Sequence, residues 1–294
     1  MTSIVIPAHN EGRVIGRLLD SLLAESCTDE FDIVVVCNGC TDDTAQVAGG
    51  RGADVRVVEI AEPSKHRALR TGDEHAHGFP RLYVDADVVI TTSDVRALIQ
   101  PLDDSSAILA TAPERDLPLA GCAWRVRAYY QVWQRLPAVR RGLFGRGVIA
   151  VSEAGYARIA ALPPLMADDL AASLAFAPDE RLVVDTARVV VHPPRTWPDL
   201  IKRRIRAATS SAQLEHHQRQ ERGGDRREAA DAAVAPSART GKADLLAILR
   251  AEPKLVPGIV VFLWAAVAAR RGSRKAIRSQ DFGTWLRDES SRQG

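Results

Sequence analysis

The sequence predicts an α/β fold in which helices flank a mostly parallel β-sheet. Over about the first 90 of its 294 residues, short apolar runs rich in β-branched residues alternate with segments of helical periodicity. This alternation is typical of βαβ units, whose strands run parallel and whose crossovers are right-handed. Polar residues directly follow several of these runs, at the edge where open α/β sheets bind ligands. With 46% hydrophobic and 26% charged residues, the chain has the composition of an ordinary globular protein.

The first 92 residues are expected to hold four buried strands with helices between them. The strands are the apolar runs 3–8, 31–37, 55–60 and 82–90. The helices are expected at 13–23, after the Asn38–Gly39 turn, and at 64–77. Thr41 or Asp42 is a suitable N-cap for the second helix. In 13–23 the apolar residues recur three and four positions apart, which places them on one helical face.

The remaining elements continue the same alternation as far as residue 218. Strands are expected at 106–111 and 145–151, and the runs 181–184 and 187–192 could pair with each other. Helices are expected at 93–102, 120–141, 152–159 with Ser152 as cap, 168–175 and 197–218. We therefore predict a main domain at 1–218, with a first half at about 1–92 and a second at about 93–218.

A change of composition separates this domain from the C-terminal residues. Residues 219–240 are polar and aperiodic, which predicts a flexible linker. Helices are expected beyond it at 242–250, 256–271 and 282–287, so residues 241–294 form a helical C-terminal extension. The longest apolar run, 256–269, has about 14 residues, short of the roughly 20 that span a bilayer. No signal peptide opens the chain.

Charge and cysteine content narrow the choice of partner and compartment. Residues 195–294 hold 20 basic and 11 acidic residues, against 19 and 26 in the rest of the chain. A basic C-terminal third suits an anionic partner such as a phosphate or a membrane surface, or is a solvated helical face. No nucleic-acid-binding motif is found, so we expect no nucleic-acid partner. Four cysteines without a second C-x-x-C pair predict reduced thiols in a cytoplasmic protein, not a disulfide framework or a zinc site.

Two carboxylates, Asp85 and Asp87, interrupt the apolar run 82–90 with one residue between them. An ionised carboxylate is costly to desolvate unless it is paired or bound to a metal. At the carboxyl edge of a parallel strand, the pair could hold a divalent cation and, through it, a diphosphate. An ordinary surface turn is the alternative for this motif taken alone.

Polar residues also follow the first two strands and begin the third helix. The segment Pro7-Ala8-His9-Asn10-Glu11 contains neither the Gly-x-Gly-x-x-Gly nor the Walker A pattern, so a nucleotide would be held by side chains and metal. Asn38 offers an amide donor and acceptor suited to a base edge, or else only forms a turn. Lys65 begins a basic helical turn that suits a diphosphate, or is part of a charged face.

Taken together, residues 4–11, 38–44, Lys65 with Ala68-Leu69, and 85–87 resemble the family 2 glycosyltransferases, over roughly residues 1–200. The resemblance implies the GT-A fold, a Rossmann-like sheet with a nucleotide-sugar half at 1–92 and an acceptor half at 93–218. It implies that Asp87 binds Mg²⁺ or Mn²⁺ directly and that Asp85 lies nearer the ribose or a metal-bound water. Such a cation neutralises charge on the departing nucleoside diphosphate. Nucleoside contacts are implied for Pro7, His9, Asn10, Glu11 and Asn38, and a diphosphate contact for Lys65.

The segment Met166–Leu174 resembles the Glu-Asp motif that supplies the catalytic base in this family. The phase of the leucines puts Asp169 in the place of the base and Asp168 in that of the Glu. A base there takes the proton of the acceptor hydroxyl, which gives inversion in one step without a covalent intermediate. N-capping with favourable dipole contact at a helix start is the alternative for these two acids.

Three positions depart from the family pattern or extend it. Ala175 stands where the family often has Arg, which affects acceptor contacts. Residues 203–207 stand where processive members have Gln-x-x-Arg-Trp, so we expect a single transfer. Arg203 and Arg206 are expected either to approach the diphosphate or only to decorate the helix. His192 follows a late strand, where it could complete the metal shell or be structural, and a neutral imidazole suits Mn²⁺ better than Mg²⁺.

The resemblance implies a nucleotide-sugar donor of the UDP, GDP or TDP type and a small-molecule, lipid-linked or glycan acceptor. Residues 256–278, outside the resemblance, are either an interfacial helix at the inner face of the membrane or a helix docked on the catalytic domain or a partner in a homodimer. A sugar-phosphate nucleotidyltransferase is the rival enzyme, but its Gly-rich, Arg-containing loop is missing after the first strand. A non-catalytic nucleotide-binding module is the other alternative.

Overall fold

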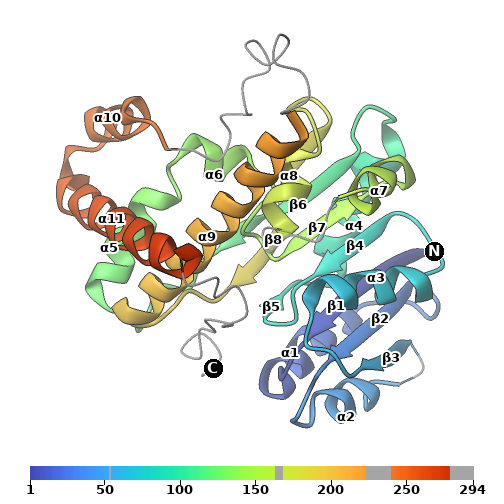
Figure 1. The fold of residues 1–294 in the computed structure, drawn as a ribbon. Helices are drawn as coiled ribbons and strands as arrows, with labels where there is room; N and C mark the ends of the chain where they lie inside the picture. The colour runs from blue at the N-terminus through green and yellow to red at the C-terminus, as the bar shows by residue number, and fades with distance from the viewer. Residues whose placement is uncertain (53, 163–167, 223–239, 279–294) are drawn as a thin grey trace.

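The computed structural model describes residues 1–52, 54–162, 168–222 and 240–278 (Figure 1). Eight strands of this part of the chain form one mixed sheet in the order β3-β2-β1-β4-β7-β6-β8-β5. Helices cover the sheet, and further helices at the C-terminus gather beside its second half (Figure 1). The predicted α/β class is confirmed.

The first half is a parallel sheet with helices on both faces. Its strands are β1 (Thr2–Ala8), β2 (Phe31–Asn38), β3 (Val55–Ile60) and β4 (Arg81–Val84). Its helices are α1 (Gly12–Leu23), α2 (Thr44–Gly49) and α3 (Lys65–His75). Every residue of β1 and β2 is buried, as expected for parallel strands covered on both sides. Gly72 lets α3 approach β1, because a Cβ at this position would lie 2.3 Å from Cγ1 of Val5.

The sequence had suggested one strand at 82–90, but the structure divides this run into two strands. β4 ends at Val84, the chain turns at the two carboxylates, and β5 (Val88–Val89) pairs antiparallel with β8 (Arg181–Val191) instead. The backbone N–H of Asp85 donates to the carbonyl of Gly147 at 2.7 Å, which fixes the start of the turn. The carboxylates therefore stand at the carboxyl end of β4, beside the neighbouring strand β7 (Val148–Val151).

The second half mixes strand directions because β7 runs antiparallel to both β4 and β6 (Ala110–Asp116). β6 begins and ends later than the strand predicted at 106–111. The two runs expected to pair with each other, 181–184 and 187–192, form the single strand β8, which runs parallel to β6. The helices are α4 (Thr92–Asp104), α5 (Trp124–Trp133), α6 (Pro137–Arg141), α7 (Glu153–Ala160), α8 (Asp168–Leu174) and α9 (Trp197–Arg222). The helix expected at 120–141 is broken in two, with Pro137 at the start of α6. Ser152 caps α7 as predicted, its Oγ accepting from the N–H of Gly155.

The C-terminal helices share a core with the second half. They are α10 (Lys242–Ala251), the 3₁₀ turn η2 (Pro253–Leu255) and α11 (Val256–Arg278), and α11 packs against α5 and α9 (Figure 1). Phe262 of α11 stacks on Tyr129 of α5 with ring centroids 5.3 Å apart. Of the expected linker, residues 219–222 continue α9, while 223–239 and the helix expected at 282–287 lie outside the described residues.

One described segment, Pro253–Lys275, is long and apolar enough to cross a membrane by length and composition alone. The sequence had suggested that this region is too short to span a bilayer, because only the unbroken apolar run was counted. By length and composition, that expectation is wrong. About a third of the segment is buried within the protein. Burial of that face against α5 and α9 accounts for part of its apolar character, and a core helix of a soluble protein passes the same test.

Candidate active site

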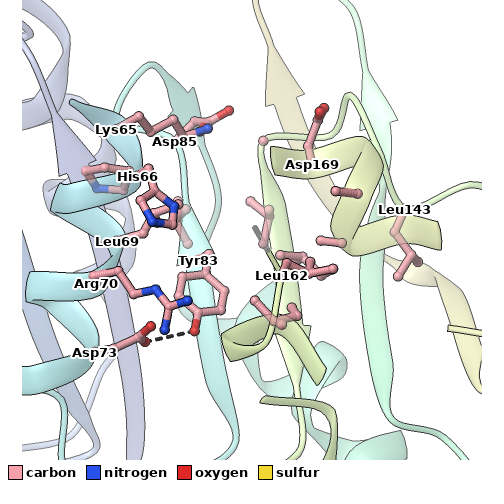
Figure 2. Close-up of a pocket in the computed structure, with 18 of the residues that line it drawn as sticks. Lys65, His66, Leu69, Arg70, Asp73, Tyr83, Asp85, Leu143, Leu162 and Asp169 are labelled. Atoms are coloured by element: carbon pink, nitrogen blue, oxygen red, sulfur yellow. Dashed lines mark hydrogen bonds and ion pairs between the residues drawn. The ribbon is translucent and has the colours of Figure 1, made fainter. Parts of the chain in front are cut away.

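A cavity lies between the two halves, at the carboxyl end of β4. It is lined by side chains of α3 and β4 on one side and of β7, α7 and α8 on the other. Figure 2 shows Lys65 and Asp85 on the first side and Asp169 facing them from the second. The structure thus brings together three of the residues that the sequence singled out, although they belong to segments far apart in the chain.

Asp85 is held by a cation and by close backbone packing. The Nζ of Lys65 donates to its Oδ1 at 2.8 Å, and both side chains are about one third to two fifths exposed. Gly147 lies against the other side, where a Cβ would be 3.4 Å from Oδ2 of Asp85 and 2.5 Å from Cγ1 of Val88. With φ at +68°, Gly147 also has a backbone conformation that favours glycine. Lys65 and Gly147 together fix where the Asp85 carboxylate can lie.

Asp169 stands in the first turn of α8 with both carboxylate oxygens engaged. Its Oδ2 accepts from the N–H of Gly145 at 2.9 Å and its Oδ1 from the N–H of Leu170 at 2.7 Å. The N-terminus of a helix also favours a negative charge. These contacts hold the carboxylate at the rim of the cavity. Asp168 begins α8, and its side chain lies outside what the structure describes.

Arg206 of α9 lies in the electric field of the acids on both sides of the cavity. Desolvation and then the neighbouring Arg203 lower its pKa, while Asp85, Asp169 and Asp87 oppose that shift. Arg206 nevertheless keeps exposed surface, so the protein surrounds the guanidinium without closing over it. Such a cation is placed to meet an anion that enters between the acids.

His192 and Asp87 lie near each other at the ends of β8 and β4. Desolvation, Arg17 and Arg195 lower the pKa of His192, and Asp87 acts in the opposite direction. Arg203 donates to the carbonyl of His192 at 3.4 Å, which links α9 to this corner. A lowered pKa favours the neutral imidazole, which is the form that binds metal.

The donor atoms of Asp85, Asp87 and His192 suit a divalent cation chemically. Among the described residues, however, no three His, Cys, Asp or Glu side chains converge on one point. Within the described residues, Asp85, Asp87 and His192 do not form a closed metal site. This fits a cation that takes its remaining ligands from a bound diphosphate, as Mg²⁺ sites commonly do.

The loops after β1 and β2 bind each other at the same edge of the sheet. Nδ1 of His9 lies 2.5 Å from the carbonyl oxygen of Asn38, and Oδ1 of Asn10 accepts from the N–H of Thr41 at 2.7 Å. The N–H of Glu11 donates to Oγ1 of Thr44 at 2.8 Å. These contacts join the two loops to each other. Pro7 of β1 lines the cavity, whereas His9, Asn10, Glu11 and Asn38 lie outside its lining.

The buried Asn38 is only half satisfied. Its Nδ2 donates to the carbonyl of Ala8 at 2.8 Å, and its Oδ1 is buried with no hydrogen-bond partner in the described part of the chain. The sequence had suggested Thr41 or Asp42 as the N-cap of α2, but neither residue occupies that position. Asp43 holds that position without a side-chain cap bond, while Asp42 still accepts from the N–H of Thr44, the first residue of α2, at 3.2 Å and from the N–H of Gly12 at 3.1 Å.

Two arginines that the sequence did not single out, the buried Arg146 and the half-buried Arg115, organise the loop before β7. Arg146 is fully buried and donates to the carbonyls of Gly142 and Pro113 at 3.0 and 2.6 Å. Arg115 donates to the carbonyl of Gly145 at 3.4 Å, and desolvation lowers its pKa to about 9. Arg115 also donates to the carbonyl of Phe144 at 3.1 Å, and the N–H of that same peptide unit, which belongs to Gly145, donates to Asp169, so Arg115 acts on the acid through one peptide unit. The glycines that flank Arg146 were the available signal, since they mark a tightly folded loop.

The chain resembles proteins of one known family. The model of the family described as Glycosyl transferase family 2 matches residues 3–155, just over half of the chain. A 4,4'-diaponeurosporenoate glycosyltransferase of Staphylococcus aureus (strain bovine RF122 / ET3-1) is 36% identical over 118 residues, covering 38% of this chain and 31% of that protein. The chain thus aligns with about a third of the length of this curated relative.

Two solved structures share the fold. A mannosyltransferase from Pyrobaculum calidifontis, in complex with GDP-Man and Mn²⁺, has a TM-score of 0.58 at 20% identity, covering 95% of this chain and 75% of that one. A glucosyl-3-phosphoglycerate synthase from Mycobacterium tuberculosis, in complex with Mn²⁺, UDP-Glc and phosphoglyceric acid, has a TM-score of 0.50 at 21% identity, covering 68% and 74%.

The mixed sheet with its flanking helices gives the chain the GT-A fold. The family match identifies the chain more closely. It belongs to glycosyl transferase family 2.

Proposed function

We propose that the protein is a metal-dependent, inverting glycosyltransferase that moves one sugar from a nucleotide-sugar donor to an acceptor hydroxyl. The supporting observation is that Asp85 and Asp169 line one cavity from opposite sides (Figure 2). Inversion requires the acceptor oxygen and the leaving group to lie on opposite faces of the anomeric carbon. Two acids facing each other across a cavity suit that requirement, one near the leaving group and one near the acceptor.

The donor lies against residues 1–92 in this proposal. Pro7, His9, Asn10 and Glu11 line the nucleoside, and Asn38 meets the base edge. The buried, unpartnered Oδ1 of Asn38 supports this role, because an N–H of a base would complete its hydrogen bonding. The acceptor lies against residues 93–218, and the C-terminal extension supports α5 and α9 from behind.

Positive charge for the diphosphate comes from Lys65, Arg203 and Arg206 in this scheme. Asp87, with Asp85 and His192, would hold the Mg²⁺ or Mn²⁺. When bound, that cation neutralises charge on the departing nucleoside diphosphate. The mutual fields of Arg206, Asp85 and Asp87 support one shared site for these groups.

Asp169 is the general base in the chemical step. Its carboxylate takes the proton of the acceptor hydroxyl while the hydroxyl oxygen bonds to the anomeric carbon. The bond from that carbon to the diphosphate oxygen breaks, and its electron pair leaves with the nucleoside diphosphate. Backbone N–H donors from Gly145 and Leu170 hold the carboxylate in place, and Asp168 stands beside it in the family's Glu position. A single displacement inverts the anomeric centre.

We propose a class of nucleotide-sugar donor and not one particular donor. The two solved structures were determined with GDP-Man and with UDP-Glc. We propose a UDP, GDP or TDP sugar here, with a small-molecule, lipid-linked or glycan acceptor. A single transfer, and not polymer synthesis, fits residues 203–207, which do not form the box of processive members.

Peripheral contact with a membrane is part of the proposal. An apolar stripe on α11 consists of side chains that are 45–62% exposed: Val256, Val260, Leu263, Trp264 and Val267. Exposed basic residues continue this face at Arg270, Arg271, Arg274 and Lys275. Apolar residues beside a basic cluster suit an anionic membrane surface. We propose that a cytoplasmic enzyme rests on the inner face of the membrane through this stripe.

Asp169→Asn tests the proposed function directly. The change keeps the shape of the side chain but leaves it unable to take a proton, so transfer should fall by at least about 100-fold. Calorimetry with UDP, GDP and TDP, each with and without Mn²⁺, should show metal-dependent binding that is equal in this variant and the wild type. Asp179→Asn, at an exposed acid outside the cavity, is the matched control. Wild-type turnover in Asp169→Asn would reject the base assignment.

A further inference from the structure

The cavity beside Asp169 has mainly aliphatic walls. It is lined by Leu69 of α3, Val148 and Ile149 of β7, Ile159 of α7, Leu162 just after α7, and Ala172 of α8. Figure 2 shows Asp85, Asp169 and Lys65 toward one end of the cavity and Asp73 toward the other, with Leu162 and Leu143 on the same side as Asp169. A molecule that reaches Asp169 through this space meets hydrocarbon on several sides.

The polar groups at the other end of the cavity are already bound to the protein. Asp73 accepts from the hydroxyl of Tyr83 at 2.8 Å and from Nη1 of Arg81 at 3.1 Å. Arg70 donates to the carbonyl of Ala160. Burial raises the pKa of both Asp73 and Tyr83, which indicates a poorly hydrated environment. These polar groups therefore already have hydrogen-bond partners within the protein.

This lining discriminates between classes of acceptor. A sugar placed in the cavity would bury several hydroxyls against aliphatic side chains, and each unpaired polar group is costly. A hydrocarbon body needs no hydrogen bonds and gains from leaving water. The cavity also reaches Asp169, so a molecule whose hydrocarbon body lies in this space can place a hydroxyl at that carboxylate.

We propose that the acceptor is an aliphatic alcohol, a hydroxyl carried on a hydrocarbon body that fills this cavity, with the hydroxyl at Asp169. The inference rests on the proposed role of Asp169 as the base. It narrows the acceptor to a molecule with a hydrocarbon body and excludes a glycan in this space.

Binding of straight-chain 1-alkanols from butanol to decanol, measured by calorimetry on the full chain without donor, tests the proposal. Affinity should rise about fourfold for each methylene until the cavity is filled and then stop rising. Leu69→Gln should weaken octanol binding at least about tenfold, and Ile159→Gln provides the same test if the first variant fails to fold. Leu246→Gln makes the same chemical change at an exposed leucine of α10 and should bind as the wild type does. Maltose should not bind.

The outcomes separate this inference from the proposed function. If transfer to a glycan proceeds while alkanols fail to bind, or bind equally well in Leu69→Gln and Ile159→Gln, the aliphatic acceptor is refuted and the transferase stands. If alkanols bind in the cavity but no nucleotide sugar with Mn²⁺ yields a transfer product to any alcohol or glycan, the proposed function fails, and with it the role of the alkanol as acceptor. Alkanol-dependent transfer that is lost in Leu69→Gln and retained in Leu246→Gln supports both.

Discussion

Replacing Gly147 with alanine tests whether the loop before β7 positions Asp85. The φ of +68° costs an L-residue about 1–2 kcal/mol. The added Cβ would also lie 2.5 Å from Cγ1 of Val88 and 3.4 Å from Oδ2 of Asp85. Overpacking of this kind costs about 1–3 kcal/mol. Gly147→Ala should therefore lower the free energy of unfolding by about 2–5 kcal/mol and displace the Asp85 carboxylate.

Gly121→Ala separates backbone strain from contact. Gly121 has φ of +76°, and a Cβ there would meet no atom within 4 Å. This variant should lose only about 1–2 kcal/mol, as measured by urea denaturation. Calorimetry with Mn²⁺ and the nucleoside diphosphate that the wild type binds should show affinity at least about tenfold weaker in Gly147→Ala, and unchanged in Gly121→Ala. Equal losses of stability, together with wild-type binding in both variants, would refute the positioning role of Gly147.

Three further changes probe the loop, the acid stability and the membrane contact. Arg115→Met should lower kcat about 100-fold with little change in KM, because Asp169 loses its support through Gly145. Arg115→Lys should recover part of the lost kcat. Unchanged kinetics in Arg115→Met would contradict the reasoning. Glu180, whose pKa the paired Arg158 lowers to about 2 from its ordinary 4.5, stabilises the fold above pH 4.5 and loses this effect as pH falls toward 2. Urea midpoints between pH 7 and 3 should therefore fall less steeply in Glu180→Gln than in the wild type, and parallel curves would contradict the pairing. Val260→Glu should weaken sedimentation with anionic vesicles about tenfold, while transfer to a soluble acceptor persists; undiminished sedimentation would exclude the α11 stripe.

The sequence predicted the first half well because its signals are local. The apolar runs that form β1 and β2 are buried on both faces, so they needed no partner to be recognised. The polar residues that end these strands converge because parallel strands present their carboxyl ends at one edge. This rule places Asn38 and Asp85 in one region before any coordinates are known.

The second half depended on pairings that no local pattern encodes. The runs expected at 181–184 and 187–192 do not pair with each other, because both pair with β6 on either side of a register shift between Pro113 and Glu114. β5 leaves the line of β4 because its partner lies at the far edge of the sheet. Arg115 and Arg146 resemble surface charges in the sequence, and only the folded loop turns their guanidinium groups toward buried carbonyls. Their roles are consequences of tertiary structure.

The charges of the site also bear on the order of binding. The described groups that act on one another here include the acids Asp85, Asp87 and Asp169 and the cations Arg203 and Arg206. With Lys65 paired to Asp85, the acids and cations roughly balance before any ligand arrives. A divalent cation alone would add charge beside Arg206, and a diphosphate alone would add charge beside Asp85 and Asp169. Each ligand compensates the other, so we expect metal and nucleotide to bind with positive coupling, each raising the affinity for the other by the same factor.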